Sequence, residues 1–318
     1  MSLSDFLTID FPSISVVVFC AASCGLAGNF LVLQRQALFS DAISHVVFPG
    51  VVVGFLLTGS IATLPLVLGA IFAALISIVL IQTLIHVGDI EKGAAMGIVF
   101  TAMFASGIVL LEQTGASNAH IDTEHALYGN LESVLWIELK TWSDFFMWDI
   151  LRTMPRQLAT LFIISSLIFI ATFFFFKELK LSTFDPGFAY ILGLPSRFLS
   201  GAIFLVVALA AVASFEIVGS IMVIAMFICP AATARMITDT LSIQLILSVV
   251  IAVVTAVVGY LSAAFGPHLW GSTHSLSAAG MIAVVAGIFL SIAMIAGPKY
   301  GVLSRAKRAH GRQLDLTT

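Results

Sequence analysis

The residues with the clearest chemical potential are Asp41 and His45, an Asp-x-x-x-His pair at the start of a long apolar stretch. Residues four apart on a helix lie on the same face, so this carboxylate and imidazole would point the same way. A charged side chain at mid-bilayer costs about 2.5–3.5 kcal/mol on insertion scales, which favours a function for such groups. A carboxylate beside a neutral imidazole suits Mn(II), Fe(II) or Zn(II). The pair is therefore a candidate ion site, and whether it handles an ion depends on the rest of the chain.

The elements that must position this pair are apolar helices in a membrane. Of the 318 residues, 60% are hydrophobic and only 10% are charged, whereas soluble domains carry about 25% charged residues. Apolar runs separated by short polar breaks are typical of a multi-pass helical protein. We expect an all-α membrane protein, a single domain over residues 1–318 built as a bundle of about eight to nine transmembrane helices.

Nine candidate spans can be placed on the sequence. They are Ser13–Gln34, Asp41–Thr58, Ile61–Leu84, Ala94–Glu112, Gln157–Phe176, Phe198–Ser214, Glu216–Ala234, Leu241–Phe265 and Ala278–Ala296. The sixth and seventh almost abut at Ser214-Phe215-Glu216, which leaves open a broken or re-entrant helix there.

The distribution of Lys and Arg predicts the orientation of the chain. With an odd number of spans and the N-terminus outside, eleven basic residues fall in inner segments and three in outer ones. The C-terminus and the basic tail over residues 299–318 are then cytoplasmic. The three outer basic residues lie in the long outer loop over residues 113–156.

That outer loop contains His120, Asp122, Glu124 and His125. The cluster could bind a cation, although an ordinary solvated loop is the more common meaning of such residues. The aromatic residues that follow are typical of an interfacial belt.

The inner loop after the fifth span has the pattern of a short capped helix. Asp185 can cap it with Pro186 at its first position, and Gly193 can close it. Phe188 and Leu192 would then lie on one face. Spacing alone leaves two interpretations open, docking of another protein or packing against lipid or the bundle itself.

Prolines and one acid are notable in the second and seventh spans. Pro49-Gly50 follows the Asp41/His45 pair, and Pro230 lies inside the seventh span, where a proline kinks a helix; these are candidate kink or gating positions. Glu216 at the outer end of the seventh span is either a cation ligand or, somewhat more in keeping with its position, an interfacial acid.

Several enzyme classes have no support in the sequence. No G-x-x-x-x-G-K-[ST] motif is present, so the chain is not expected to bind ATP itself. H-E-x-x-H and G-x-S-x-G are also absent, which gives no basis for hydrolase chemistry. We expect no permanently bound cofactor, and a carrier or channel that moves a cation without ATP is one class of protein that these absences leave open.

Six sequence blocks in order resemble the integral membrane permeases of the ABC-3 family, bacterial importers of manganese, zinc and iron. The blocks are Gly28–Leu33 with Asp41–His45 and Pro49-Gly50; Gly93–Phe100; Leu127–Gly129; Phe184–Pro186 with Ala189 and Leu192–Leu194; Val218-Gly219 with Pro230–Ala234; and Gly297–Leu303.

This resemblance implies roles that spacing alone does not. It places Asp41 and His45 in the metal translocation path, and it assigns an ATPase-coupling helix to about residues 185–194, with Asp185, Pro186, Phe188, Ala189, Leu192 and Gly193. It implies a complex in the bacterial inner membrane, built like the vitamin B12 and iron-siderophore (type II) importers. Its partners would be two ATPases, a second permease and an external metal-binding protein, with no nucleic acid. The pattern is most similar to the manganese or iron branch.

Overall fold

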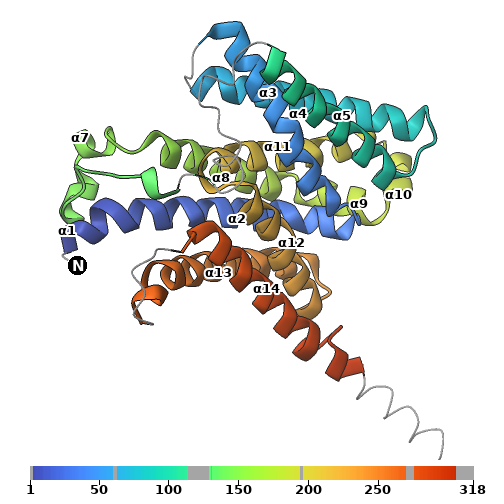
Figure 1. Cartoon of the computed structure of the whole chain (residues 1–318). Helices are drawn as coiled ribbons and strands as arrows, with labels where there is room; N and C mark the ends of the chain where they lie inside the picture. Colours follow the sequence, from blue (N-terminus) through green and yellow to red (C-terminus); the bar gives the residue numbers. More distant parts are fainter. Residues whose placement is uncertain are drawn as a thin grey trace, which may run out of the picture.

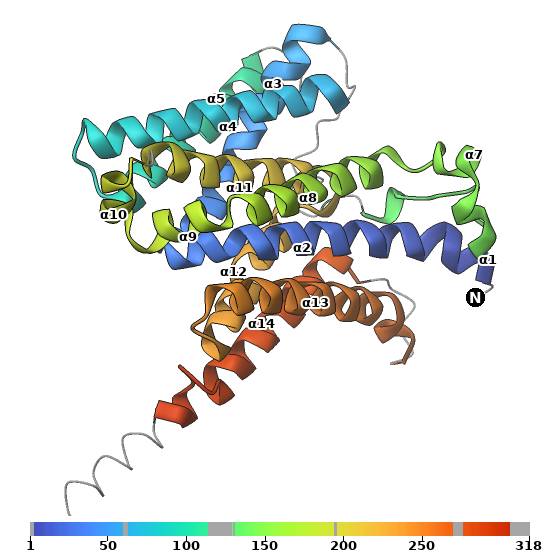
Figure 2. The same ribbon diagram turned by 180° about the vertical axis from the view of Figure 1, so that it is seen from behind.

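The computed structural model describes residues 3–59, 63–113, 129, 131–193, 196–269 and 276–305, and these residues form helices and connecting turns without a strand. Figures 1 and 2 show the arrangement. The elements are α1 (Leu3–Asp5), η1 (Phe6–Asp10), α2 (Phe11–Leu33), α3 (Leu38–Thr58), α4 (Thr63–His86), α5 (Lys92–Gln113), η3 (Leu131–Ser133), η4 (Trp142–Phe146), α7 (Trp148–Leu151), α8 (Arg156–Phe174), α9 (Phe176–Phe184), α10 (Pro186–Ile191), α11 (Ser196–Val218), α12 (Ser220–Ile237), α13 (Leu241–Leu269) and α14 (Ala278–Ala296).

The all-helical membrane fold is confirmed. Within the described residues, eight helices are long and apolar enough to cross a membrane, and α11 contains a shorter apolar stretch, Gly201–Phe215. Each of the nine predicted spans coincides with one helix, namely α2, α3, α4, α5, α8, α11, α12, α13 and α14. The expected bundle of about eight to nine helices is therefore present.

Helix α2 is the centre of the bundle. It packs against α8 and α11 on one side and against α12 and α13 on the other (Figures 1 and 2). Small residues on α2 permit these close crossings: a Cβ on Gly28 would collide with the backbone of Phe227 in α12. A buried polar link also joins α2 to α13, since the Asn29 amide donates to Ser248 Oγ at 2.6 Å and accepts from Gln244 Nε2 at 3.0 Å.

The break between the sixth and seventh predicted spans lies at Gly219, three residues beyond the position expected from sequence. Gly219 has φ 78° and ψ 165°, a backbone conformation that costs other residues energy but is open to glycine. Helix α11 therefore continues to Val218, and α12 begins directly after the break, at Ser220. Backbone atoms of Gly129 pack closely against Ile217 and Val218 at this break.

The inner loop predicted after the fifth span contains a further helix before α10. Residues Phe176–Phe184 form this helix, α9, which includes the charged residues Lys177, Glu178 and Lys180. Lys, Glu and Leu have high helix propensity, so the segment folds as a helix once it leaves the apolar bundle.

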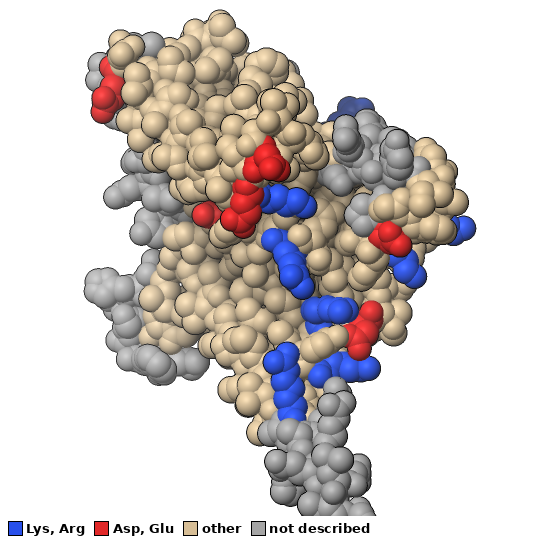
Figure 3. Space-filling model, turned by 90° about the vertical axis from the view of Figure 1, so that its right-hand side faces the viewer, with Lys and Arg blue, Asp and Glu red and all other residues tan. Residues whose placement is uncertain are grey.

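The two ends of the bundle differ in charge. The end that carries α9, α10 and the C-terminal end of α14 is called here the basic end, and Figure 3 shows Lys and Arg side chains in a band across it. Seven basic residues whose side chains are described lie at this end: Arg35, Lys92, Lys177, Lys180, Arg235, Lys299 and Arg305. Lys140, Arg152 and Arg156 lie at the opposite end, called the N-terminal end, where the Trp136 backbone N–H donates to Thr8 O at 2.9 Å.

Candidate metal-ion site

Asp41 and His45 lie one turn apart at the start of α3, as the sequence predicted. The distance between His45 Nε2 and Asp41 Oδ1 is 3.8 Å, and the two side chains are 34% and 45% exposed. This separation is too long for a hydrogen bond. Two ligand atoms at about 2.0–2.2 Å from one ion lie roughly 3–4 Å apart, so the pair can share a metal ion without rearrangement.

The imidazole of His45 is held by two aromatic rings of α5. Its ring stacks on Phe100 at 5.4 Å between centroids, and Phe104 meets it edge-on at 5.2 Å. Aromatic contacts of this kind restrict a ring to few orientations. Phe100 and Phe104 were not predicted as site residues, although their four-residue spacing on the fourth predicted span could have indicated a shared face.

Pro49 and Gly50 lie one turn beyond His45, where α3 packs between α4 and α5. A Cβ on Gly50 would collide with the backbone of Gly69 in α4, and one on Gly107 in α5 would lie 3.0 Å from Pro49 Cα. Small residues at these contacts bring the three helices close and fix the position of the pair. A gating role for Pro49 and Gly50 stays a prediction.

The other predicted site residues lie apart from this cluster or outside the described part of the chain. Pro230 is buried in α12, and a Cβ on Gly25 of α2 would lie 3.8 Å from its Cβ. The backbone of Glu216 belongs to α11, three residues before Gly219, but its side chain is not among those described. The loop with His120 and His125 also lies outside the described residues.

No third metal ligand joins the pair within the described chain. Among those residues, no group of three or more His, Cys, Asp and Glu side chains is close enough to hold a metal ion. Metals of this class take four to six ligands. One copy of the chain, as far as it is described, thus provides part of a coordination shell.

The predicted short helix near residue 185 is present as α10, at the basic end. Asp185 Oδ1 accepts a hydrogen bond from the Phe188 backbone N–H at 2.9 Å, which is the expected cap. Phe188 and Leu192 are 48% and 57% exposed, whereas Ala189 is fully buried. Gly193 follows with φ 77°. The helix therefore presents an apolar face to its surroundings, while its role in docking stays a prediction.

The turn between α2 and α3 is recessed from the basic end. In Figures 1 and 2 it lies further inside the bundle than α10 and than the α4–α5 turn. Because Asp41 lies in the first turn of α3, the pair lies deeper than a helix that starts level with its neighbours would place it.

Comparison with known proteins shows which family has this sequence and fold. Residues 8–297 match the family model described as the ABC 3 transport family. The chain is 35% identical to the manganese transport system membrane protein MntD of Bacillus subtilis, covering 95% of this chain and 97% of that protein. It is 34% identical to the zinc transport system membrane protein TroD of Treponema pallidum, covering 98% and 79% respectively.

Solved structures agree with these sequence matches. A chain of PsaBC from Streptococcus pneumoniae, solved in complex with Fab, superimposes with a TM-score of 0.71 at 26% identity over 91% of each chain. A metal-chelate type ABC transporter in an inward-facing conformation shares the fold, with a TM-score of 0.58 at 14% identity over 90% of this chain and 86% of that chain.

Proposed function

The chain belongs to the ABC 3 transport family as a membrane permease of a metal-transporting ABC system, and from this premise we propose that it serves an ATP-driven importer whose preferred cargo is manganese. The observation that carries the proposal is the Asp41/His45 pair, a carboxylate and an imidazole placed 3.8 Å apart in an apolar helix. Both groups are ligands for Mn(II), Zn(II) and Fe(II).

A second permease would complete the metal path. One chain supplies two ligands here, and two chains around a shared pore would supply four, within the range that these metals use. The partial exposure of both side chains supports this arrangement, because it leaves the pair accessible from outside its own bundle. The partner permease is either a second copy or a related chain.

Metal choice in such a site cannot rest on raw affinity. The Irving–Williams order gives zinc tighter binding than manganese at a given set of nitrogen and oxygen ligands. Manganese preference would therefore come from the geometry of the shared site or from the external binding protein that delivers the ion. The 35% identical relative is a manganese transport system membrane protein, which supports manganese as cargo, with zinc and iron next.

Transport would be powered through α10. This helix is joined directly to α9 and lies just before α11, which packs against α2, α3, α4 and α8. An ATPase subunit that pushes on the exposed face formed by Phe188 and Leu192 would move these helices together. The basic end then faces the cytoplasm, in agreement with the positive-inside rule, and the N-terminal end faces the external binding protein.

Uptake by reconstituted complexes tests this function. The permease, its ATPase and its partner permease, placed in vesicles with the binding protein outside, should accumulate manganese only when ATP is present at the ATPase. Competing zinc or iron in the external medium should reduce manganese uptake less than added manganese does. Equal uptake with and without ATP would instead indicate a carrier or channel, and preferential zinc uptake would overturn the choice of cargo.

A further inference from the structure

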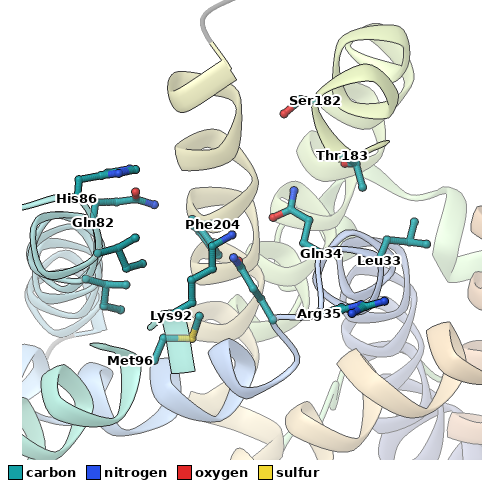
Figure 4. A pocket seen from close by; sticks show the side chains of 13 residues that line it. Leu33, Gln34, Arg35, Gln82, His86, Lys92, Met96, Ser182, Thr183 and Phe204 are labelled. Atoms are coloured by element: carbon teal, nitrogen blue, oxygen red, sulfur yellow. The ribbon is translucent and has the colours of Figure 1, made fainter. Parts of the chain in front are cut away.

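A cavity opens at the basic end of the bundle. Its volume is about 410 Å³, and it lies between the ends of α2, α4 and α9, the start of α5 and the side of α11. In Figure 4, His86 and Lys92 reach toward this space from one side and Ser182 from the other, with Gln34 between them. Neither Asp41 nor His45 lines it.

The charged side chains that line this cavity are all basic. Arg35 and Lys92 carry permanent positive charges, His86 can carry a third, and no Asp or Glu is among the lining residues. Neither Arg35 nor Lys92 forms an ion pair with another residue of the described chain. Helices α2, α4 and α9 end here and α5 begins here, and each terminus contributes about half a charge. The three helix ends are negative and the one helix start is positive, a net of about −1, which is smaller than the two permanent positive charges, so the cavity stays positive.

Two hydroxyl groups in the wall of the cavity lack partners. Ser182, which is 3% exposed, and Thr183 have buried side-chain oxygens that form no hydrogen bond within the described chain. Many helical Ser and Thr residues of the described chain donate their hydroxyl to a carbonyl of the same helix, as Thr83 and Thr101 do at 2.7 Å, whereas Thr233 and Thr255 share the lack of a partner with Ser182 and Thr183. The hydroxyls of α9 are therefore available to donate to a bound molecule, and a buried polar group without a partner calls for such an explanation.

We propose that this cavity is a binding site for a phosphate group carried on an organic molecule. Guanidinium, ammonium and hydroxyl donors lie in the α2–α3 turn, at the start of α5 and in the last turn of α9, which suits an anion with several acceptor oxygens. The cavity is larger than one phosphate, and Leu33, Met96 and Phe204 give it an apolar wall suited to the organic part. The phosphate could belong to an anionic lipid of the adjacent leaflet or to a soluble phosphate compound.

The site would connect two parts of the basic end. Ser182 and Thr183 belong to the last turn of α9, directly before the Asp185 cap of α10, whereas His86 and Lys92 belong to α4 and α5. An occupant that contacts both groups would link the base of α10 to these helices. The binding claim stands on the cavity alone and does not depend on the transport function proposed above.

Binding to the purified full-length chain in a neutral detergent tests the proposal. Inorganic phosphate is titrated by calorimetry, and phosphatidylglycerol is titrated by native mass spectrometry, with diacylglycerol as a lipid that lacks phosphate. We expect saturable binding of at least one phosphate probe and no comparable binding of diacylglycerol. Phosphate binding would identify a soluble source, and binding of phosphatidylglycerol alone would identify a lipid.

Three variants locate the site. The double change Arg35→Gln with Lys92→Gln should weaken binding by about tenfold or more, because it removes charge-assisted hydrogen bonds. Ser182→Ala, which keeps every charge, should weaken it several-fold. Lys177→Gln, an exposed charge on α9 that does not line the cavity, should leave binding unchanged. Absence of binding by the unaltered chain, or equal losses in Lys177→Gln and the double variant, would overturn the proposal.

Discussion

His45 Nε2 lies 3.8 Å from Asp41 Oδ1, one helical turn away on the same face of α3. The imidazole is held on its other side by Phe100 and Phe104 of α5, so its orientation is set by packing and not by a hydrogen bond to the carboxylate. The two ligand atoms can therefore be bridged by one metal ion. We propose that the cargo metal passes between these two side chains.

Replacing Gly28 with alanine should destabilise the chain. A Cβ at this position would collide with the backbone of Phe227, and backbone of α12 cannot rotate away as a side chain can. Overpacking of this kind typically costs about 1–3 kcal/mol. Thermal unfolding of the detergent-purified protein measures the effect.

Gly287→Ala is the matched control for that change, because a Cβ on this α14 glycine would meet nothing within 4 Å. Alanine favours the helix over glycine, so the control should unfold at the same temperature as the unaltered chain or slightly higher. Equal unfolding temperatures for Gly28→Ala and Gly287→Ala would show that the α2–α12 crossing is looser than described.

A charge on α10 should separate ATP hydrolysis from transport. Phe188→Glu places a carboxylate on the exposed apolar face of α10, where an ATPase would dock, so metal uptake should fall sharply for each ATP hydrolysed. Val302→Glu is the control, since Val302 is also exposed at the basic end, at 64%, but outside α10. If the two variants transport equally well per ATP, α10 does not couple the subunits.

Asp239 should stabilise the basic end in a pH-dependent way. The Tyr300 hydroxyl donates to Asp239 Oδ1 at 2.7 Å and Lys299 Nζ lies 3.2 Å from Oδ2; these hydrogen bonds, that from Tyr300 foremost, hold the pKa of the carboxyl below its ordinary value of 3.8. A carboxyl whose pKa is depressed by folding contributes stability above its ordinary pKa and loses it as the pH falls through the folded value.

Asp239→Asn should therefore unfold at a slightly lower temperature than the unaltered chain at neutral pH, and the gap should close in acid below the ordinary pKa. Tyr300→Phe should reproduce part of the effect. Thermal unfolding across this pH range is the measurement. A gap that is the same at neutral and acid pH would mean that the carboxylate charge plays no part.

The apolar helices and the capped α10 could be predicted from the sequence because both depend on local patterns. A run of about 20 apolar residues has few structures available in a bilayer, and the Asp185-Pro186 start of α10 is encoded in adjacent residues. The same locality explains why Asp41 and His45 could be paired, since four-residue spacing on a helix is enough to bring them together.

The remaining features depend on contacts between distant residues. Tyr260 donates to the buried carboxylate of Asp10 at 2.9 Å, across 250 positions of sequence, and this contact explains why η1 extends the first span into residues that look polar. The helix break lies at Gly219 because its positive φ angle costs glycine less energy than it would cost the neighbouring residues. The cavity lined by Lys92 and Ser182 likewise requires the packing of five helices.

Metal uptake by Asp41→Asn and His45→Gln variants tests most directly whether the cargo metal passes between these two side chains. Both variants keep the size of the side chain while removing the ligand charge or the imidazole nitrogen, and assembly with the ATPase is confirmed by copurification. Glu91→Gln, an exposed acid in the α4–α5 turn, serves as the control. Both site variants should lose most manganese uptake, while the control should keep it. Unimpaired uptake by both assembled site variants would contradict a role for this pair in the metal path.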